Sequence, residues 1–283
     1  MTSAETPDAR RAAKRQTLAI LLGVMAFAAT FTLWGALRSV QFRRNRDTPS
    51  TQLPEAVLLA QLPVDSRQVL ACRPGWNNWA EALQTVLPQT FALISPGQKP
   101  TQWVAGWAVD SQQPTLVADF PAGPTSPEGW KAFGGVWTRP ARLQTPGEGS
   151  GWAPGLSLVV KNRLQKEAVL WAAGVGIPWG NSSGSQIWSL ASDRAQASKV
   201  SELAAGAKTW LVWVEPQPNR TLIRAEMECS SAQEASRIEK ALESFQQNPS
   251  RPGAGVRFLA DGPWLSLQAT MDSPVGLPGP AKR

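Results

Sequence analysis

The sequence predicts an α+β fold, with a single N-terminal transmembrane helix followed by a domain of antiparallel sheet with packed helices. Three observations lead to this prediction. A run of 21 residues near the N-terminus carries no charge. Several later segments alternate apolar and polar residues, with the period of two that half-buried strands have. Between them lie segments whose apolar residues recur at helical spacing, some behind a capping residue.

The uncharged run is Thr17–Leu37, which as a helix would span roughly 30 Å, the thickness of a bilayer's hydrocarbon core. This run is longer than the apolar core of a secretory signal, which has about 7–15 residues. Cleavage near Ala29 or Ala36 is the alternative. Basic residues flank it on both sides and would favour anionic lipid head groups. They are Arg10, Arg11, Lys14, Arg15, Arg38, Arg43, Arg44 and Arg46.

The flanking charges do not decide the orientation of this helix, because four of these basic residues precede it and four follow it. A short N-terminal tail usually stays inside. We therefore expect the N-terminus in the cytoplasm and the C-terminal domain in a periplasmic or extracellular position.

Composition and pattern divide the chain into six regions. We expect a disordered basic tail over 1–16, the transmembrane helix over 17–37 and a polar stalk over 38–62. Two α+β halves and a disordered Pro/Gly-rich tail follow. The halves span 63–175 and 176–271, and the tail spans 272–283.

The first half is predicted to run strand, helix, hairpin, helix, hairpin. Its helix over 76–87 should end at Pro88. Thr125 and Glu128 have the spacing of a capping box, which predicts a second helix. The predicted strands are Arg67–Cys72, Gln102–Val109, Thr115–Phe120, Leu156–Val160 and Ala168–Ala172.

The second half repeats this order. We expect one helix over Ser192–Ala205 and another that begins at the capping box Ser231–Glu234. The predicted strands are Gln186–Leu190, Trp210–Val214, Thr221–Cys229, Val256–Ala260 and Trp264–Met271.

Residue matches support a duplication of these halves. Trp107 and Trp213 are 106 residues apart, as are Thr125 and Ser231. We therefore predict two duplicated strand–helix–hairpin–helix–hairpin halves. The alternative is that hairpins before capped helices recur by chance.

Composition excludes several kinds of chemistry. The chain has no His, which removes imidazole bases, His-ligated metals and the His of a Ser or Cys triad. The net charge is +7, but residues 1–50 hold eight of the 28 basic and three of the 21 acidic residues. The remaining chain is close to neutral, which argues against nucleic-acid binding. We expect no cofactor and no metal, because no motif for either is present.

Few residues qualify as catalytic candidates. Gly180–Gly184 has the spacing of a nucleophile elbow around Ser182, but that serine would need a His. Ser157 and Lys161 lie four residues apart on a predicted strand and would make a weak Ser–Lys pair. Carboxylates are the remaining acid–base candidates, although most lie where Asp shapes turns or caps helices. They are Asp65, Asp110, Asp119, Asp193 and Asp261.

The cysteines and tryptophans allow two interpretations each. Cys72 and Cys229 are either a possible disulfide in an oxidising compartment or two buried thiols. The chain has 14 Trp and no Tyr. The Trp side chains either fill core positions or form a stacking surface for sugars or an apolar partner.

We therefore expect a single-pass membrane protein with a non-enzymatic structural or binding role at a cell envelope, for example as an accessory subunit of a membrane assembly. Its expected partners are the lipid bilayer and a protein of that assembly. Two alternatives are an envelope-bound hydrolase or transferase that uses carboxylates, and a Trp-based glycan-binding module.

Overall fold

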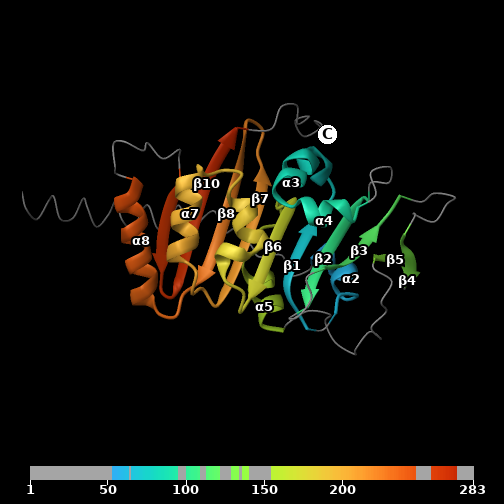
Figure 1. Cartoon of the computed structure of the whole chain (residues 1–283), viewed down its shortest axis with the longest axis horizontal. Coiled ribbons are helices and arrows are strands. Elements are labelled where there is room, and N and C mark those ends of the chain that lie inside the picture. Colours follow the sequence, from blue (N-terminus) through green and yellow to red (C-terminus); the bar gives the residue numbers. More distant parts are fainter. Residues whose placement is uncertain are drawn as a thin grey trace, which may run out of the picture. The chain divides into compact units, whose positions relative to one another are not determined.

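The computed structural model describes most of the chain from Leu53 onward (Figure 1). The predicted transmembrane helix, its basic flanks and most of both predicted tails lie outside the described residues. No helix within the described part is long and apolar enough to cross a bilayer. The described residues are 53–63, 65–94, 100–108, 113–121, 129–133, 136–139, 154–246 and 256–272.

Ten antiparallel strands form one continuous sheet, which confirms the α+β prediction in its general form (Figure 1). Their order across the sheet is β4-β5-β3-β2-β1-β6-β7-β8-β10-β9. The strands are β1 Ser66–Cys72, β2 Gln102–Ala108, β3 Thr115–Asp119, β4 Lys131–Phe133, β5 Val136–Arg139, β6 Leu170–Val175, β7 Thr209–Pro216, β8 Arg220–Glu228, β9 Arg257–Asp261 and β10 Trp264–Asp272.

The strand order is the same on both sides of the central β1–β6 pair. Read outward from that pair, one side runs β1, β2, β3, β5, β4 and the other runs β6, β7, β8, β10, β9. β6 therefore has the place in the second half that β1 has in the first.

The 106-residue match is wrong at the level of single residues. Trp107 packs against the core on one face of the sheet, whereas Trp213 belongs to the core on the other face. A shift of one residue moves a strand side chain to the opposite face. Trp103 and Trp210, which are 107 residues apart, do face the same core. The predicted helix start at Thr125 lies outside the described residues, but the residues that would continue this helix form strands β4 and β5, so the predicted helix is wrong there.

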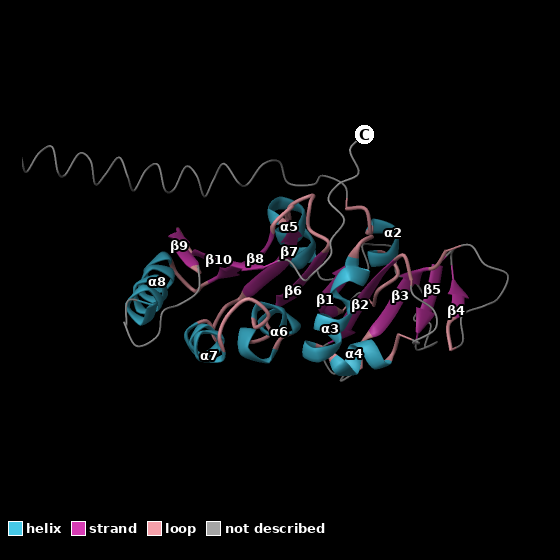
Figure 2. Cartoon of the chain, turned by 90° about the horizontal axis from the view of Figure 1, so that it is seen from above, coloured by secondary structure: helices cyan, strands magenta, loops and turns pink. Residues whose placement is uncertain are grey.

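Helices cover both faces of the sheet (Figure 2). α2 and α5 lie on one face, and α3, α4, α6, α7 and α8 lie on the other. The helices are α2 Ala56–Leu59, α3 Ala80–Val86, α4 Pro88–Ala92, α5 Pro154–Arg163, α6 Ser183–Trp188, α7 Arg194–Leu203 and α8 Ala232–Gln246, with short 3-10 helices η1 Trp76–Trp79 and η2 Trp179–Asn181.

Two predicted strands are helices in the structure. The segment 156–160 belongs to α5, where Leu156 and Val160 are buried, as is Leu164 directly after the helix. Most of 186–190 belongs to α6, which Ser182 caps. Both segments are short apolar runs, for which sequence periodicity does not separate helix from strand. Pro88 was predicted only to end the helix before it. In the structure α3 ends at Val86, and Pro88 is the first residue of the next helix, α4.

The end of the predicted stalk is part of the folded domain. Leu53, Leu58 and Leu62 are buried in the core beneath α2 and α5. Glu55 is 1% exposed, and both of its carboxylate oxygens accept hydrogen bonds from Nε of Arg73, at 3.1 and 2.9 Å. The Trp171 indole N–H also donates to Glu55. A buried carboxylate needs such partners, so this contact fixes where the chain enters the domain.

The larger core lies between the sheet and α3, α4, α6, α7 and α8, and it includes the fully buried Trp210. Gly174 is directly opposite Trp210 on the neighbouring strand, and the indole lies over it. Gly184 on α6 approaches the same indole so closely that a Cβ there would lie 2.6 Å from the ring. Two glycines thus allow α6 to pack tightly on the sheet.

We predict that Gly174→Ala destabilises the protein by about 1–3 kcal/mol, because the added methyl would overlap the Trp210 ring. Gly184→Ala should also destabilise it, because the overlap outweighs the gain of about 1 kcal/mol in helix propensity. Urea unfolding of the full chain, followed by Trp fluorescence, measures both effects. Gly180→Ala is the matched control, because its Cβ would lie 3.4 Å from Ser201. Equal stability of all three variants would refute this packing.

Candidate binding site

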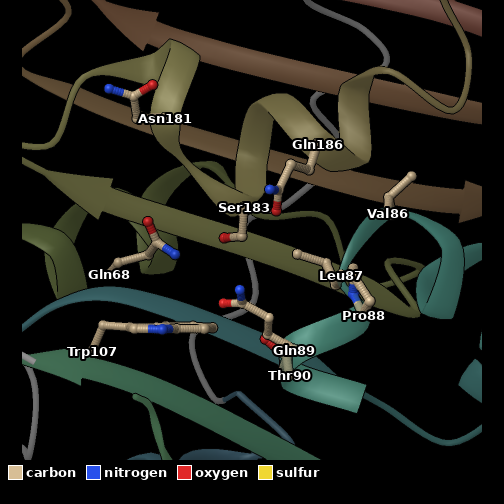
Figure 3. Close-up of a pocket in the computed structure, with 10 residues that line it drawn as sticks. All are labelled: Gln68, Val86, Leu87, Pro88, Gln89, Thr90, Trp107, Asn181, Ser183 and Gln186. Carbon is tan, nitrogen blue, oxygen red and sulfur yellow. The ribbon is translucent and has the colours of Figure 1, made fainter. Parts of the chain in front are cut away.

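A cavity of about 290 Å³ lies on the helix-rich face, between the α3–α4 turn and the η2–α6 segment (Figure 3). β1 and β2 also contribute to it. Its walls therefore come from both halves of the chain, beside the central β1–β6 pair. The lining residues are Gln68, Val86, Leu87, Pro88, Gln89, Thr90, Trp107, Asn181, Ser183 and Gln186.

Two helix starts place most of these side chains. Leu87 leaves the helical conformation at φ −127° and ψ 51°, and Pro88 then starts α4, so Gln89 and Thr90 face the cavity. Pro suits this position because the first helical N–H needs no partner. On the other side Ser182 caps α6, and the first and fourth residues of that helix, Ser183 and Gln186, share the face toward α4.

The inner part of the cavity is polar and buried. Gln68, Thr90 and Ser183 are 8%, 5% and 4% exposed. Within the described part of the chain, the Ser183 hydroxyl has no hydrogen-bond partner. Figure 3 shows this hydroxyl and the amides of Gln68 and Gln89 pointing toward one shared space. Buried polar groups in folded proteins are generally hydrogen-bonded, and the Ser183 hydroxyl is one of several buried groups of the described residues that have no protein partner.

Three of the four amides that line the cavity, and one aromatic ring, lie nearer its mouth. Gln89, Asn181 and Gln186 are exposed, and Trp107 is half-buried. No side chain that lines the cavity carries a charge. An ionic ligand would lose hydration here without gaining an opposite charge, so the site suits a neutral ligand.

The buried charges of the described residues lie on the other face of the sheet. There Glu215 pairs with Arg224 at 3.5 Å and accepts a 2.5 Å hydrogen bond from the Trp213 indole. Burial raises the pKa of Glu215, although Arg224 and the indole act in the opposite direction. Arg163 joins Glu226 at 2.5 Å on this face too. In these pairs each charge is matched by an opposite charge, and none of the four residues lines the cavity.

The serine candidates from the sequence have structural roles. The Ser182 hydroxyl accepts a hydrogen bond from Ser185 N–H at 3.2 Å and donates one to the Trp179 carbonyl at 2.6 Å. It is a buried helix cap, without the preceding strand that a nucleophile elbow needs. Ser157 and Lys161 lie on α5 and not on a strand.

The carboxylate candidates are not brought together. Asp193 caps α7 by accepting a hydrogen bond from Gln196 N–H at 2.7 Å. Asp65 precedes β1, Asp119 ends β3 and Asp261 ends β9. Asp110 lies outside the described residues. Across the described ranges there is also no cluster of three Cys, Asp or Glu that suits a metal.

The Trp side chains are mainly core residues. Nine of the twelve in the described part are buried, and Trp107, Trp137 and Trp264 are half-buried. Arg163 lies over the Trp264 ring, 3.7 Å from its centroid. Trp107 is therefore the half-buried Trp that lines the cavity. The sequence analysis did not identify the cavity residues as a site, because they are uncharged, far apart in sequence and match no motif.

Cys72 and Cys229 are both buried and free. Cys72 lies in β1 and Cys229 directly follows β8, three strands away. Three strand spacings amount to about 14 Å, more than twice the Cα separation in a disulfide. The possible disulfide is thus absent from this structure. Burial raises the pKa of Cys72 well above its usual value and that of Cys229 to about 11.

No protein family and no characterised protein matches the sequence. Solved structures that this chain partly resembles include crystal forms I and III of TP0453, which are 8% and 7% identical in sequence. The similarity covers 77% and 76% of this chain and 94% of each of those chains, with TM-scores of 0.43 and 0.39.

We predict that neither thiol reacts with dithionitrobenzoate in the folded protein at pH 8, because burial suppresses the reactive thiolate. Both should react after unfolding in guanidinium without reductant, giving two thiols per chain. Free cysteine is the calibration control. An unfolded chain with no reactive thiol would mean that the two cysteines are joined.

Proposed function

We propose that this protein has a non-enzymatic binding role at a cell envelope, where Thr17–Leu37 anchors it and the folded domain lies outside the cytoplasm. The domain holds a neutral polar ligand in the cavity between Gln68, Trp107 and Ser183. The length of the uncharged segment supports the anchor. An accessory position in a membrane assembly is compatible with this role, since a tethered domain could present its ligand to a neighbouring protein.

The unpartnered hydroxyl of Ser183 is the observation that carries the binding role. It lies with Gln68 and Thr90 at the inner end of the cavity, where an unsatisfied polar group costs about 1–3 kcal/mol. A bound ligand with its own donors and acceptors would recover this energy. The cavity volume of about 290 Å³ is near the lower end of the range for small-molecule sites.

The lining supports binding in preference to catalysis. It contains amides, hydroxyls and an indole, and none of these is a general acid or base near neutral pH. The chain also has no His to activate a hydroxyl.

We also propose that the two halves arose by duplication. The identical outward strand order supports this, and so does the helical segment that follows β1 and β6 in each half. In this view the cavity formed where the two copies meet, since its walls come from both.

Protein purified from its native membrane should carry the ligand. We expect mass spectrometry of the small molecules that the purified full chain releases on denaturation to find a neutral compound. Gln68→Leu should lower its amount about three- to tenfold, because one neutral hydrogen bond contributes about 0.5–1.5 kcal/mol.

Gln233→Leu is the matched control, because this exposed glutamine of α8 is not among the cavity residues. The control should retain the compound. The proposal fails if no neutral compound is released, or if both variants retain equal amounts.

A further inference from the structure

We propose that the ligand is a neutral saccharide, with one sugar ring stacked on the Trp107 indole and its hydroxyls bonded to the surrounding amides. This inference rests on the proposed function, because it names the class of molecule that the same cavity binds.

The hydrogen-bonding groups match sugar hydroxyls in kind. Four amides line the cavity: Gln68, Gln89, Asn181 and Gln186. Each offers two N–H donors and a carbonyl acceptor. A sugar hydroxyl both donates and accepts, so one amide can satisfy it in both directions. Thr90 and Ser183 add two hydroxyls with the same double capacity.

The placement of these groups also matches a sugar ring. The four amides come from β1, α4, η2 and α6, so they surround the space instead of lining one edge. A sugar carries hydroxyls around its whole periphery. A flat nucleobase or a single peptide group presents its polar atoms along fewer edges and would leave some of these amides without partners.

Trp107 supplies the apolar contact that a sugar ring needs. Figure 3 shows its ring edge-on, across the space from Asn181 and Ser183. The side chain is half-buried, so one part packs on the core while another part lines the cavity. A sugar ring has an apolar C–H face that buries well against an indole. Leu87 and Pro88 form a second apolar wall.

The cavity should bind the saccharide without cleaving it. Glycoside hydrolysis generally uses two carboxyl groups that flank the bond, and no carboxyl group lines this cavity. An acidic sugar would also bring a charge with no counter-charge in the lining. The expected ligand class is therefore a neutral mono- or disaccharide unit.

The test uses the full chain in phosphatidylcholine nanodiscs, because glycosidic detergents would compete for the site. Saturation-transfer NMR and calorimetry are run with glucose, galactose, mannose, N-acetylglucosamine and their 1,4-linked disaccharides. We expect at least one to bind, with the strongest saturation on the C–H protons of one ring face. Glucuronate, adenosine and N-acetylalanine methylamide are the comparison probes and should bind at least tenfold more weakly.

Variants then locate the binding. Trp107→Ala should weaken saccharide affinity about tenfold or more, whereas Trp107→Phe should retain most of it. Gln186→Ala changes an exposed side chain that should not affect folding, and it should weaken affinity about three- to tenfold. Gln233→Ala on α8 should have no effect.

The outcomes separate this inference from the proposed function. Saccharide affinity that the cavity variants leave unchanged would overturn the inference. So would binding of adenosine or the methylamide without any saccharide, although a neutral ligand in the cavity would then still be supported. If no saccharide binds while a neutral compound co-purifies in a Gln68-dependent way, only the saccharide assignment fails. The absence of any co-purified neutral compound refutes the proposed function itself.

Discussion

The contact of Trp210 with two glycines sets the distance between α6 and the sheet. Gly174 lies beneath the indole and Gly184 lies above it, and neither position has room for a Cβ. With α6 held this close, its first turn reaches the space above β1. Ser183 is therefore buried and still directed toward the cavity, while Gln186 reaches the mouth. The helix that this packing holds against the sheet thus supplies two of the polar side chains of the site.

The cavity also depends on how the two halves join. The β1–β6 pair joins them at the centre of the sheet. The α3–α4 turn of the first half forms one side of the cavity, and the η2–α6 segment of the second half forms the other. On the opposite face, Arg73 at the end of β1 binds Glu55 and the carbonyl oxygens of Gln165, Lys166 and Ala168, just before β6. The entry of the chain and the junction between the halves are therefore linked through one buried guanidinium. The buried charges of the described residues lie on this face, and no charged side chain lines the cavity.

The sequence predicted those elements whose pattern is long or sharply punctuated. β8 alternates cleanly over nine residues, and the Asp261–Gly262 turn marks the final hairpin. The Ser231 side chain caps α8 as its capping box indicated. By contrast, α5 and α6 are short apolar segments whose helical state depends on packing against the sheet. The 106-residue match failed because sequence similarity alone does not reveal on which face of a strand a Trp lies.

The site was less predictable than the fold. Gln68 and Gln186 line the same cavity only because the fold brings β1 and α6 together around it, and isolated glutamines match no motif. Ser183 has a buried hydroxyl without a protein partner, as do Ser66, Thr221 and Ser266, and this property does not exist until the chain is folded. Sequence reasoning did identify what the site cannot contain, since the absence of His had already excluded the common catalytic arrangements.

The most direct test of this account is a crystal structure of the protein purified from its native membrane, at a resolution that shows ordered water. The account predicts a non-water molecule in the cavity, in contact with the Trp107 ring and hydrogen-bonded to the Ser183 hydroxyl. A cavity filled by ordered waters alone, with Ser183 and Gln68 satisfied by them, would contradict it.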